Sequence, residues 1–332
     1  MQISSILDIV DGSLLNSPSI SFIYSIKTNA KKVKEGDLFI SKDINEIELA
    51  IKNGAFAIIL EINSPILDNE IAWIKVKNID DCIIKLIRYK LSILNLEAYS
   101  CDKVTYQLLK VYSSAFLKSI KLIPNKLENL FKIIDEIEQN DVIISYNAEI
   151  LNKIYPENKD FSKITTKLEI ENLIEHSLFE TSFSHNNIYF SKLKIPSLYL
   201  AQFLRVYNFL GGNIDFGKLK LFNNLKPLFI DRNFNLIEFG KSDRFIICQD
   251  IQSLYANEIL YMKIKYKYAK TIFITSEYIE YLKKDEQIII NTLDELRPIL
   301  RKFKFNAIYL MGFNYNQVQT YILKNEKSLT LF

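Results

Sequence analysis

The order of apolar runs between residues 31 and 60 constrains the fold of this chain more than any other feature. Charged side chains lead into Gly36-Asp37, and the apolar run Leu38–Ile40 follows at once, which is typical of a turn that enters a buried strand. A helical pattern over Ile44–Asn53 ends at a glycine, and a second apolar run spans Ala57–Leu60. The spacing predicts a strand–helix–strand unit of an α/β sheet.

Strand and helix patterns continue along the whole chain and favour an α/β fold in three parts, which we place at 1–93, 94–238 and 239–332. Further strands are expected at Ser21–Tyr24, Ile71–Val76, Leu94–Tyr99, Asp141–Tyr146, Arg244–Cys248, Thr271–Thr275, Gln287–Ile290 and Ala307–Leu310. Further helices are expected at Asp80–Leu94, Tyr106–Leu117, Lys126–Gln139, Ser197–Leu210, Phe216–Phe222, Ser253–Tyr268 and Leu293–Phe303.

Composition argues against several functional classes. The 42 basic and 39 acidic residues are well mixed and leave a net charge of +3, so no strong field favours nucleic acid or an anionic membrane. Cys82, Cys101 and Cys248 lack the spacing of a disulfide framework or a zinc site. No apolar run approaches the roughly 18 residues that span a bilayer, and the N-terminus does not have the pattern of a secretion signal. We expect a cytoplasmic protein that neither binds nucleic acid nor inserts into a membrane.

The segment Asn29–Ala55 carries a family resemblance. The pattern Asp-Ser-Arg-x-Val-x-x-Gly-Asp-Leu-Phe, followed by Ala-Ile-x-x-Gly-Ala, is typical of the N-terminal UDP-substrate domain of the Mur ligases. This chain resembles that domain, and is nearest to the UDP-MurNAc-tripeptide:D-Ala-D-Ala ligase type. The residues that match the first pattern are Val33, Gly36, Asp37, Leu38 and Phe39.

The polar triplet of that pattern is altered, because Asn29, Ala30 and Lys31 stand where Asp, Ser and Arg would be. The resemblance implies that Asn29 and Lys31 face a UDP-linked substrate. The alternative is that the turn is kept only because Gly36 and its neighbours shape the fold, and the sequence leaves both interpretations open.

The resemblance also places a phosphate-binding loop at Ala98–Thr105, where the family has Thr-Gly-x-x-Gly-Lys-Thr-Thr. Such a loop works because its glycines let backbone N–H groups point at the phosphates, while its Lys reaches the phosphate oxygens and its Thr binds Mg²⁺. Lys103 and Thr105 match in place and are the predicted cofactor-binding residues. Lys103 is either a remnant of a phosphate site or a lysine at the start of a helix, and we favour the second interpretation.

The other positions of the loop have changed in ways that oppose ATP binding. Tyr99 and Asp102 replace both glycines, so a ring and a negative charge stand where phosphates would approach. Val104 replaces a threonine and removes a hydroxyl ligand for Mg²⁺. Cys101 would be a reactive thiol if Lys103 lowered its pKa, although a buried, unreactive cysteine is the favoured interpretation.

The resemblance implies a reduced central P-loop-type domain and a Rossmann-like C-terminal domain. The interval 104–193 is too short for the rest of the family's ATPase machinery. Neither His176 nor His185 stands beside an acidic residue in a way that indicates a metal site. We therefore predict no catalytic and no metal-binding residue.

Together these observations favour a catalytically inactive Mur-ligase homologue with a binding or scaffolding role in peptidoglycan precursor synthesis. It would need no cofactor, and its partner would be a UDP-linked precursor or a cell-wall synthesis protein. The alternative is an active ATP-dependent amide ligase acting on a UDP-MurNAc-peptide. In that case Lys103 contacts the phosphates, Thr105 binds Mg²⁺, and Asn29 and Lys31 hold the UDP end. A third hypothesis is a protein interaction module.

Overall fold

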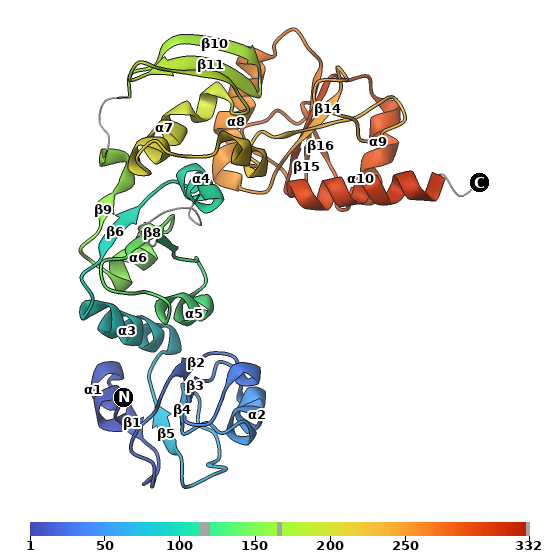
Figure 1. Cartoon of the computed structure of the whole chain (residues 1–332). Coiled ribbons are helices and arrows are strands. Elements are labelled where there is room, and N and C mark those ends of the chain that lie inside the picture. The colour runs from blue at the N-terminus through green and yellow to red at the C-terminus, as the bar shows by residue number, and fades with distance from the viewer. Residues whose placement is uncertain (113–119, 165–167, 330–332) are drawn as a thin grey trace. The chain divides into compact units, whose positions relative to one another are not determined.

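The computed structural model describes residues 1–112, 120–164 and 168–329 (Figure 1). The chain divides into two compact units. The N-terminal unit comprises Met1–Tyr106 with Ser113–Ile164, and the C-terminal unit comprises Gln107–Tyr112 with Thr165–Phe332. Each unit contains parallel β-sheet with helices, which confirms the expected α/β class. The division into three parts at 1–93, 94–238 and 239–332 stays a prediction.

The first sheet of the N-terminal unit has the strand order β1-β5-β4-β3-β2, in which only β1 is antiparallel to its neighbour. Its elements are α1 (Ile3–Val10), β1 (Ser13–Leu14), β2 (Ile26–Lys27), β3 (Leu38–Ile40), α2 (Ile47–Lys52), β4 (Ala57–Leu60), β5 (Ala72–Lys75) and α3 (Ile79–Ser92). Strands β3 and β4 have the bounds that the sequence predicts.

Successive side chains of a strand point to opposite faces of the sheet, and in β3, β4 and β5 the side chains on both faces are buried or nearly so. Leu38 and Ile40 join a core that includes residues of α1 and α3. Phe39 and the fully buried Trp73 join a smaller core on the other face, with residues of α2. The uninterrupted apolar runs of these strands are therefore explained by burial on both sides.

The second sheet of the N-terminal unit is parallel and has the order β7-β8-β6-β9. Its elements are β6 (Glu97–Ser100), α4 (Lys103–Tyr112), β7 (Ile120–Leu122), α5 (Leu130–Ile134), β8 (Val142–Ser145), α6 (Ala148–Ile154) and β9 (Lys159–Asp160). The first residues of α4, up to Tyr106, belong to this unit, and the remainder of the helix belongs to the C-terminal unit.

The C-terminal unit contains an antiparallel three-stranded sheet and a mostly parallel five-stranded sheet, β13-β14-β17-β15-β16. The antiparallel sheet has the strands β10 (Glu171–Ser177), β11 (Glu180–His185) and β12 (Ile188–Leu193), and α7 (Leu200–Phe209) and the 3₁₀ helix η7 (Phe216–Leu221) follow it. The five-stranded sheet and its helices are β13 (Pro227–Phe229), β14 (Phe245–Gln249), α8 (Gln252–Lys265), β15 (Thr271–Thr275), β16 (Gln287–Ile289), α9 (Leu296–Lys302), β17 (Ala307–Met311) and α10 (Tyr315–Leu329). Both α8 and α10 pack against β14.

Some expectations were wrong. Residues 21–24 form no strand beyond a single bridge between Phe22 and Gln2. Their backbone pairs with the start of the chain through isolated hydrogen bonds, which do not extend into a regular β-ladder. The three strands β10 to β12 and the helices α1, α6 and α10 were not anticipated. The last residues of the helix expected at Tyr106–Leu117 lie outside the described residues. None of the helices in the described ranges is long and apolar enough to cross a membrane.

Candidate functional site

The junction of β6 and α4 is the position at which the sequence places a phosphate-binding loop. Only Cys101 and Asp102 separate the strand from the helix. Asp102 caps the helix, because its carboxylate accepts hydrogen bonds from the Thr105 N–H at 2.9 Å and from the Thr105 hydroxyl at 2.6 Å. The Thr105 N–H and hydroxyl, which would face phosphate and Mg²⁺ in an ATP site, thus bind the Asp102 carboxylate instead.

Lys103 and Cys101, at the same junction, also interact with side chains of the chain itself. The Lys103 ammonium lies 5.7 Å from the ring centroid of Tyr146, in cation–π geometry. Burial, followed by the negative charges of Asp102 and Asp160, raises the pKa of the Cys101 thiol. A raised thiol pKa makes the reactive thiolate scarce, so the structure favours the interpretation of Cys101 as an unreactive cysteine.

The turn at Asn29 and Lys31 is a short capped helix. The Asn29 side chain accepts a hydrogen bond from the Lys31 N–H at 3.0 Å and caps the 3₁₀ helix η1 (Ala30–Lys32). Both side chains are exposed. The structure therefore brings the two predicted substrate-binding residues together at the surface, and their contact with a substrate stays a prediction.

The matching part of the family pattern has a structural explanation. Gly36 and Gly54 both have positive φ, +89° and +94°, which L side chains rarely adopt. The Gly36 N–H donates to the Gly54 carbonyl at 3.0 Å, and a Cβ on Gly54 would lie 2.9 Å from the Glu35 Cα. The buried Asp37 carboxylate accepts from the Lys34 N–H and closes the turn. These residues are explained by the fold alone.

A crevice lies at the carboxyl ends of β3, β4 and β5, three neighbouring parallel strands. Ligands of parallel α/β sheets commonly bind at such an edge. Its volume is about 340 Å³, and we call it the strand-end crevice. It is lined by Ser41, Lys42, Ile44, Ile47, Leu60, Glu61, Ile62, Asn78, Ile79 and Asp80.

The polar groups of the strand-end crevice hold one another in place. The Lys42 ammonium pairs with the Asp80 carboxylate at 2.7 Å, and the Glu61 carboxylate accepts from the Ile79 N–H at 3.2 Å, at the start of α3. One lysine against two carboxylates leaves the lining net negative. It therefore suits a neutral ligand with N–H and hydroxyl donors better than it suits a phosphate group.

Sequence reasoning missed the strand-end crevice, although a usable signal was present. Ser41-Lys42 directly follows the apolar run Leu38–Ile40, and Glu61 directly follows Ala57–Leu60. Polar residues that end two neighbouring parallel strands meet at one edge of the sheet. Asn29 and Lys31 do not line this crevice.

Both histidines make structural hydrogen bonds. The ring of His176 bonds the Ser182 hydroxyl at 2.7 Å, and the buried ring of His185 bonds the backbone carbonyl of Glu169 at 2.7 Å. Within the described part of the chain, no group of three or more His, Cys, Asp or Glu side chains is arranged to hold a metal ion.

Comparison with known proteins reveals a likeness of fold. No protein-family model and no curated protein matches the sequence. Among solved structures, the MurF ligase from Thermotoga maritima in complex with ADP is 14% identical, with a TM-score of 0.57 over 91% of this chain and 98% of that one. MurF from Acinetobacter baumannii (crystal structure I) is 10% identical, with a TM-score of 0.58 over 98% of both chains.

A third solved structure is similar to the same extent. It is the UDP-N-acetylmuramoylalanyl-D-glutamyl-2,6-diaminopimelate–D-alanyl-D-alanyl ligase from Acinetobacter baumannii, which is 10% identical with a TM-score of 0.56 over 98% of both chains. At such low identity the likeness concerns the fold alone. The resemblance expected from the sequence is confirmed at that level: the chain has a Mur-ligase-like α/β fold over nearly its whole length.

Proposed function

We propose that this chain is a catalytically inactive protein of Mur-ligase-like fold that binds a UDP-linked peptidoglycan precursor in the cytoplasm. The cap that Asp102 forms on α4 is the observation that carries the proposal. Formation of an acyl phosphate from ATP needs N–H donors, a Lys and Mg²⁺ around the phosphates. At this junction the Asp102 carboxylate occupies both the N–H and the hydroxyl of Thr105.

Charge adds to this argument. A phosphate near the first turn of α4 would lie beside the Asp102 carboxylate, and two like charges about 4 Å apart repel by roughly 1 kcal/mol in water and more where the site is dry. Tyr99 precedes the junction and carries a ring where the family has a glycine. ATP binding would thus require the cap on Thr105 to open and the phosphates to lie beside the Asp102 carboxylate.

The strand-end crevice supports the proposal that the chain binds a UDP-linked precursor. Its carboxylates at Glu61 and Asp80 match the N–H of uracil and the hydroxyls of ribose, which are donors. Its negative lining disfavours the diphosphate, which would therefore extend away from the crevice. The uridine end of a UDP-linked precursor is the part that fits.

Calorimetry on the full chain tests the proposal that the protein is catalytically inactive. Titration with ATP and Mg²⁺ is expected to give no binding heat, for the wild type and for Lys103→Ala alike. Micromolar binding that Lys103→Ala abolishes would overturn the proposal and favour the ATP-dependent ligase instead.

A second titration tests the proposal that the protein binds a UDP-linked precursor. Its ligands are uridine, UDP and a UDP-N-acetylmuramoyl-tripeptide. Asp80→Asn is expected to weaken uridine, because it replaces one carboxylate oxygen of the strand-end crevice, an acceptor, with an NH₂ donor. Asp81→Asn is the matched control, since Asp81 lies in the same first turn of α3 but outside the lining. Asn29→Ala and Lys31→Ala test the residues expected from the sequence. Absence of binding by all three ligands would contradict the proposal.

A further inference from the structure

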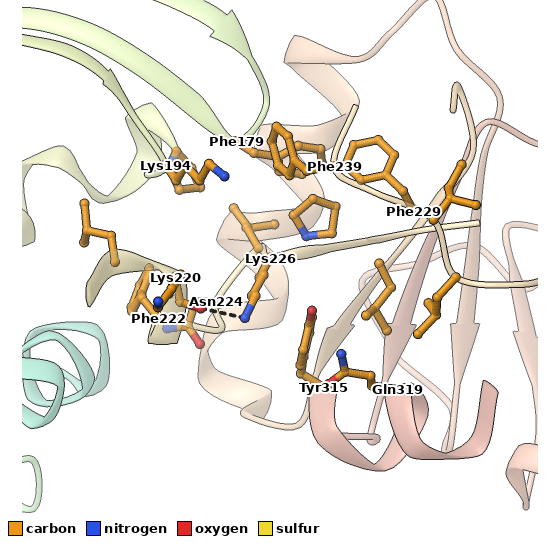
Figure 2. A pocket seen from close by; sticks show the side chains of 17 residues that line it. Phe179, Lys194, Lys220, Phe222, Asn224, Lys226, Phe229, Phe239, Tyr315 and Gln319 are labelled. Carbon is orange, nitrogen blue, oxygen red and sulfur yellow. Dashed lines mark hydrogen bonds between the residues drawn. The ribbon is translucent and has the colours of Figure 1, made fainter. Parts of the chain in front are cut away.

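The C-terminal unit contains a cavity of about 280 Å³ that none of the preceding arguments uses. Figure 2 shows that it lies where the end of β12, the helix η7, the segment entering β13 and the start of α10 come together. We call it the three-lysine cavity, after Lys194, Lys220 and Lys226. Its volume suits a small molecule, not a protein segment.

The charge of the cavity is uncompensated. Three lysines line it, and no aspartate or glutamate does. The ion pairs found among the described residues involve none of these three lysines. Side chains of one sign that converge on a partly desolvated cavity favour a ligand of the opposite sign.

Lys226 is the most constrained of the three. Its ammonium donates to the Lys220 carbonyl at 2.6 Å and to the Asn223 side-chain oxygen at 3.4 Å, and it lies 4.4 Å from the Tyr315 ring centroid. An ammonium has three N–H donors, and these two bonds leave one for a ligand. Burial, and then the positive charge of Lys194, lowers the pKa of Lys226. An anion between the two ammoniums would relieve that repulsion.

Aromatic side chains line the cavity beside the lysines (Figure 2). Phe239 lies with its ring centroid 5.1 Å from that of Phe229 and 6.4 Å from that of Phe179. The Lys194 ammonium lies 4.8 Å from the Phe239 centroid, so charge and ring surface adjoin in the cavity. This arrangement can bury an apolar or aromatic body while an ammonium binds its charged end.

We propose that the three-lysine cavity binds a small organic anion, consisting of a carboxylate or phosphate group on an aromatic or apolar body. All of its lining residues belong to the C-terminal unit. It is therefore distinct from both the β6–α4 junction and the strand-end crevice, and the inference does not depend on the proposed function.

Ligand-observed NMR titrations of the full chain test this site with phenyl phosphate, phenylacetate and the neutral 2-phenylethanol. The anions are expected to bind at least about tenfold more tightly than the alcohol, and to weaken as salt rises from 50 to 500 mM, since screening acts on charge pairs. A tighter phosphate or a tighter carboxylate identifies the preferred head group, and either supports the proposal. Equal affinity of the alcohol and the anions would overturn it.

Matched lysine variants locate the site. Lys194→Gln and Lys220→Gln are each expected to raise the anion dissociation constant at least about threefold, a loss typical of one partly exposed charge contact. Lys220→Gln keeps the backbone carbonyl that holds Lys226. Lys192→Gln and Lys218→Gln are neighbours outside the cavity and are expected to change nothing. Anion binding that survives both cavity variants unchanged would also overturn the proposal.

Discussion

Glu258 is a carboxyl group with no solvent exposure in the interior of the C-terminal unit. The Tyr199 hydroxyl and the Gln249 amide donate to one of its oxygens, and the Tyr309 hydroxyl donates to the other. Burial raises its pKa from 4.5 to about 7, although the three hydrogen bonds act in the opposite direction. The desolvation of the charge therefore outweighs three donors.

This raised pKa predicts a pH dependence of stability. Between about pH 4.5 and pH 7 the folded chain holds a proton on Glu258 that the unfolded chain has lost. The free energy of unfolding therefore falls as pH rises through this window, by at most about 1.4 kcal/mol per pH unit from this group, and levels off above it. Glu258→Gln should remove that slope. Calorimetric unfolding at pH 5, 6, 7 and 8 measures it, with the exposed Glu238→Gln as control, and equal slopes for wild type and Glu258→Gln would contradict the prediction.

Gly54 offers a second test at the scale of one residue. An alanine there would keep φ near +94° and place its Cβ 2.9 Å from the Glu35 Cα, a backbone atom that cannot easily move. Left-handed strain of about 1–2 kcal/mol and overpacking of about 1–3 kcal/mol predict a loss of roughly 2–5 kcal/mol. Urea unfolding followed by Trp73 fluorescence measures this loss. Lys52→Ala, an exposed change in the preceding helix α2, should cost little, and a Gly54→Ala protein as stable as Lys52→Ala would refute the explanation.

At the scale of elements, α4 depends on its cap. Asp102→Ala removes both hydrogen bonds to Thr105 and is expected to cost about 1 kcal/mol, because the first-turn N–H loses its partner. Amide hydrogen exchange in the first turn of α4 should rise accordingly. Asp102→Asn keeps an acceptor oxygen and should stay near the wild type. Exchange in Asp102→Asn as fast as in Asp102→Ala would show that charge, not capping, matters there.

The same elements explain how far sequence reasoning reaches. Strands β3, β4 and β15 were predicted with the bounds that the structure has, because each is a short apolar run buried on both faces. Strand β10 was missed because all of its residues are exposed, so no alternation of apolar and polar side chains marks it. Its pairing with β11 comes from tertiary contacts that no local pattern records.

The candidate site was predictable in part. The loss of the glycines at Tyr99 and Asp102 is visible in the sequence, and the capping role of Asp102 follows from its position three residues before Thr105. The three-lysine cavity was not predictable, because Lys194, Lys226 and Tyr315 are far apart in sequence and meet only through the packing of the C-terminal unit. Long-range convergence of this kind leaves no local signal.

At the scale of the whole molecule, the two units have hydrophobic clusters with no residue in common, which surround both sheets of the N-terminal unit and the five-stranded sheet of the C-terminal unit. Trp73 is the chain's single tryptophan and is fully buried in the N-terminal unit, so its fluorescence reports that unit, whereas circular dichroism reports both. Separate cores predict two unfolding steps in urea. Gly54→Ala should shift the unfolding step of the N-terminal unit, which fluorescence detects. Glu258→Gln should shift only the step of the C-terminal unit, which circular dichroism detects and fluorescence does not. If each substitution moved both steps equally, the units would unfold as one cooperative body, and the division of the core between them would be wrong.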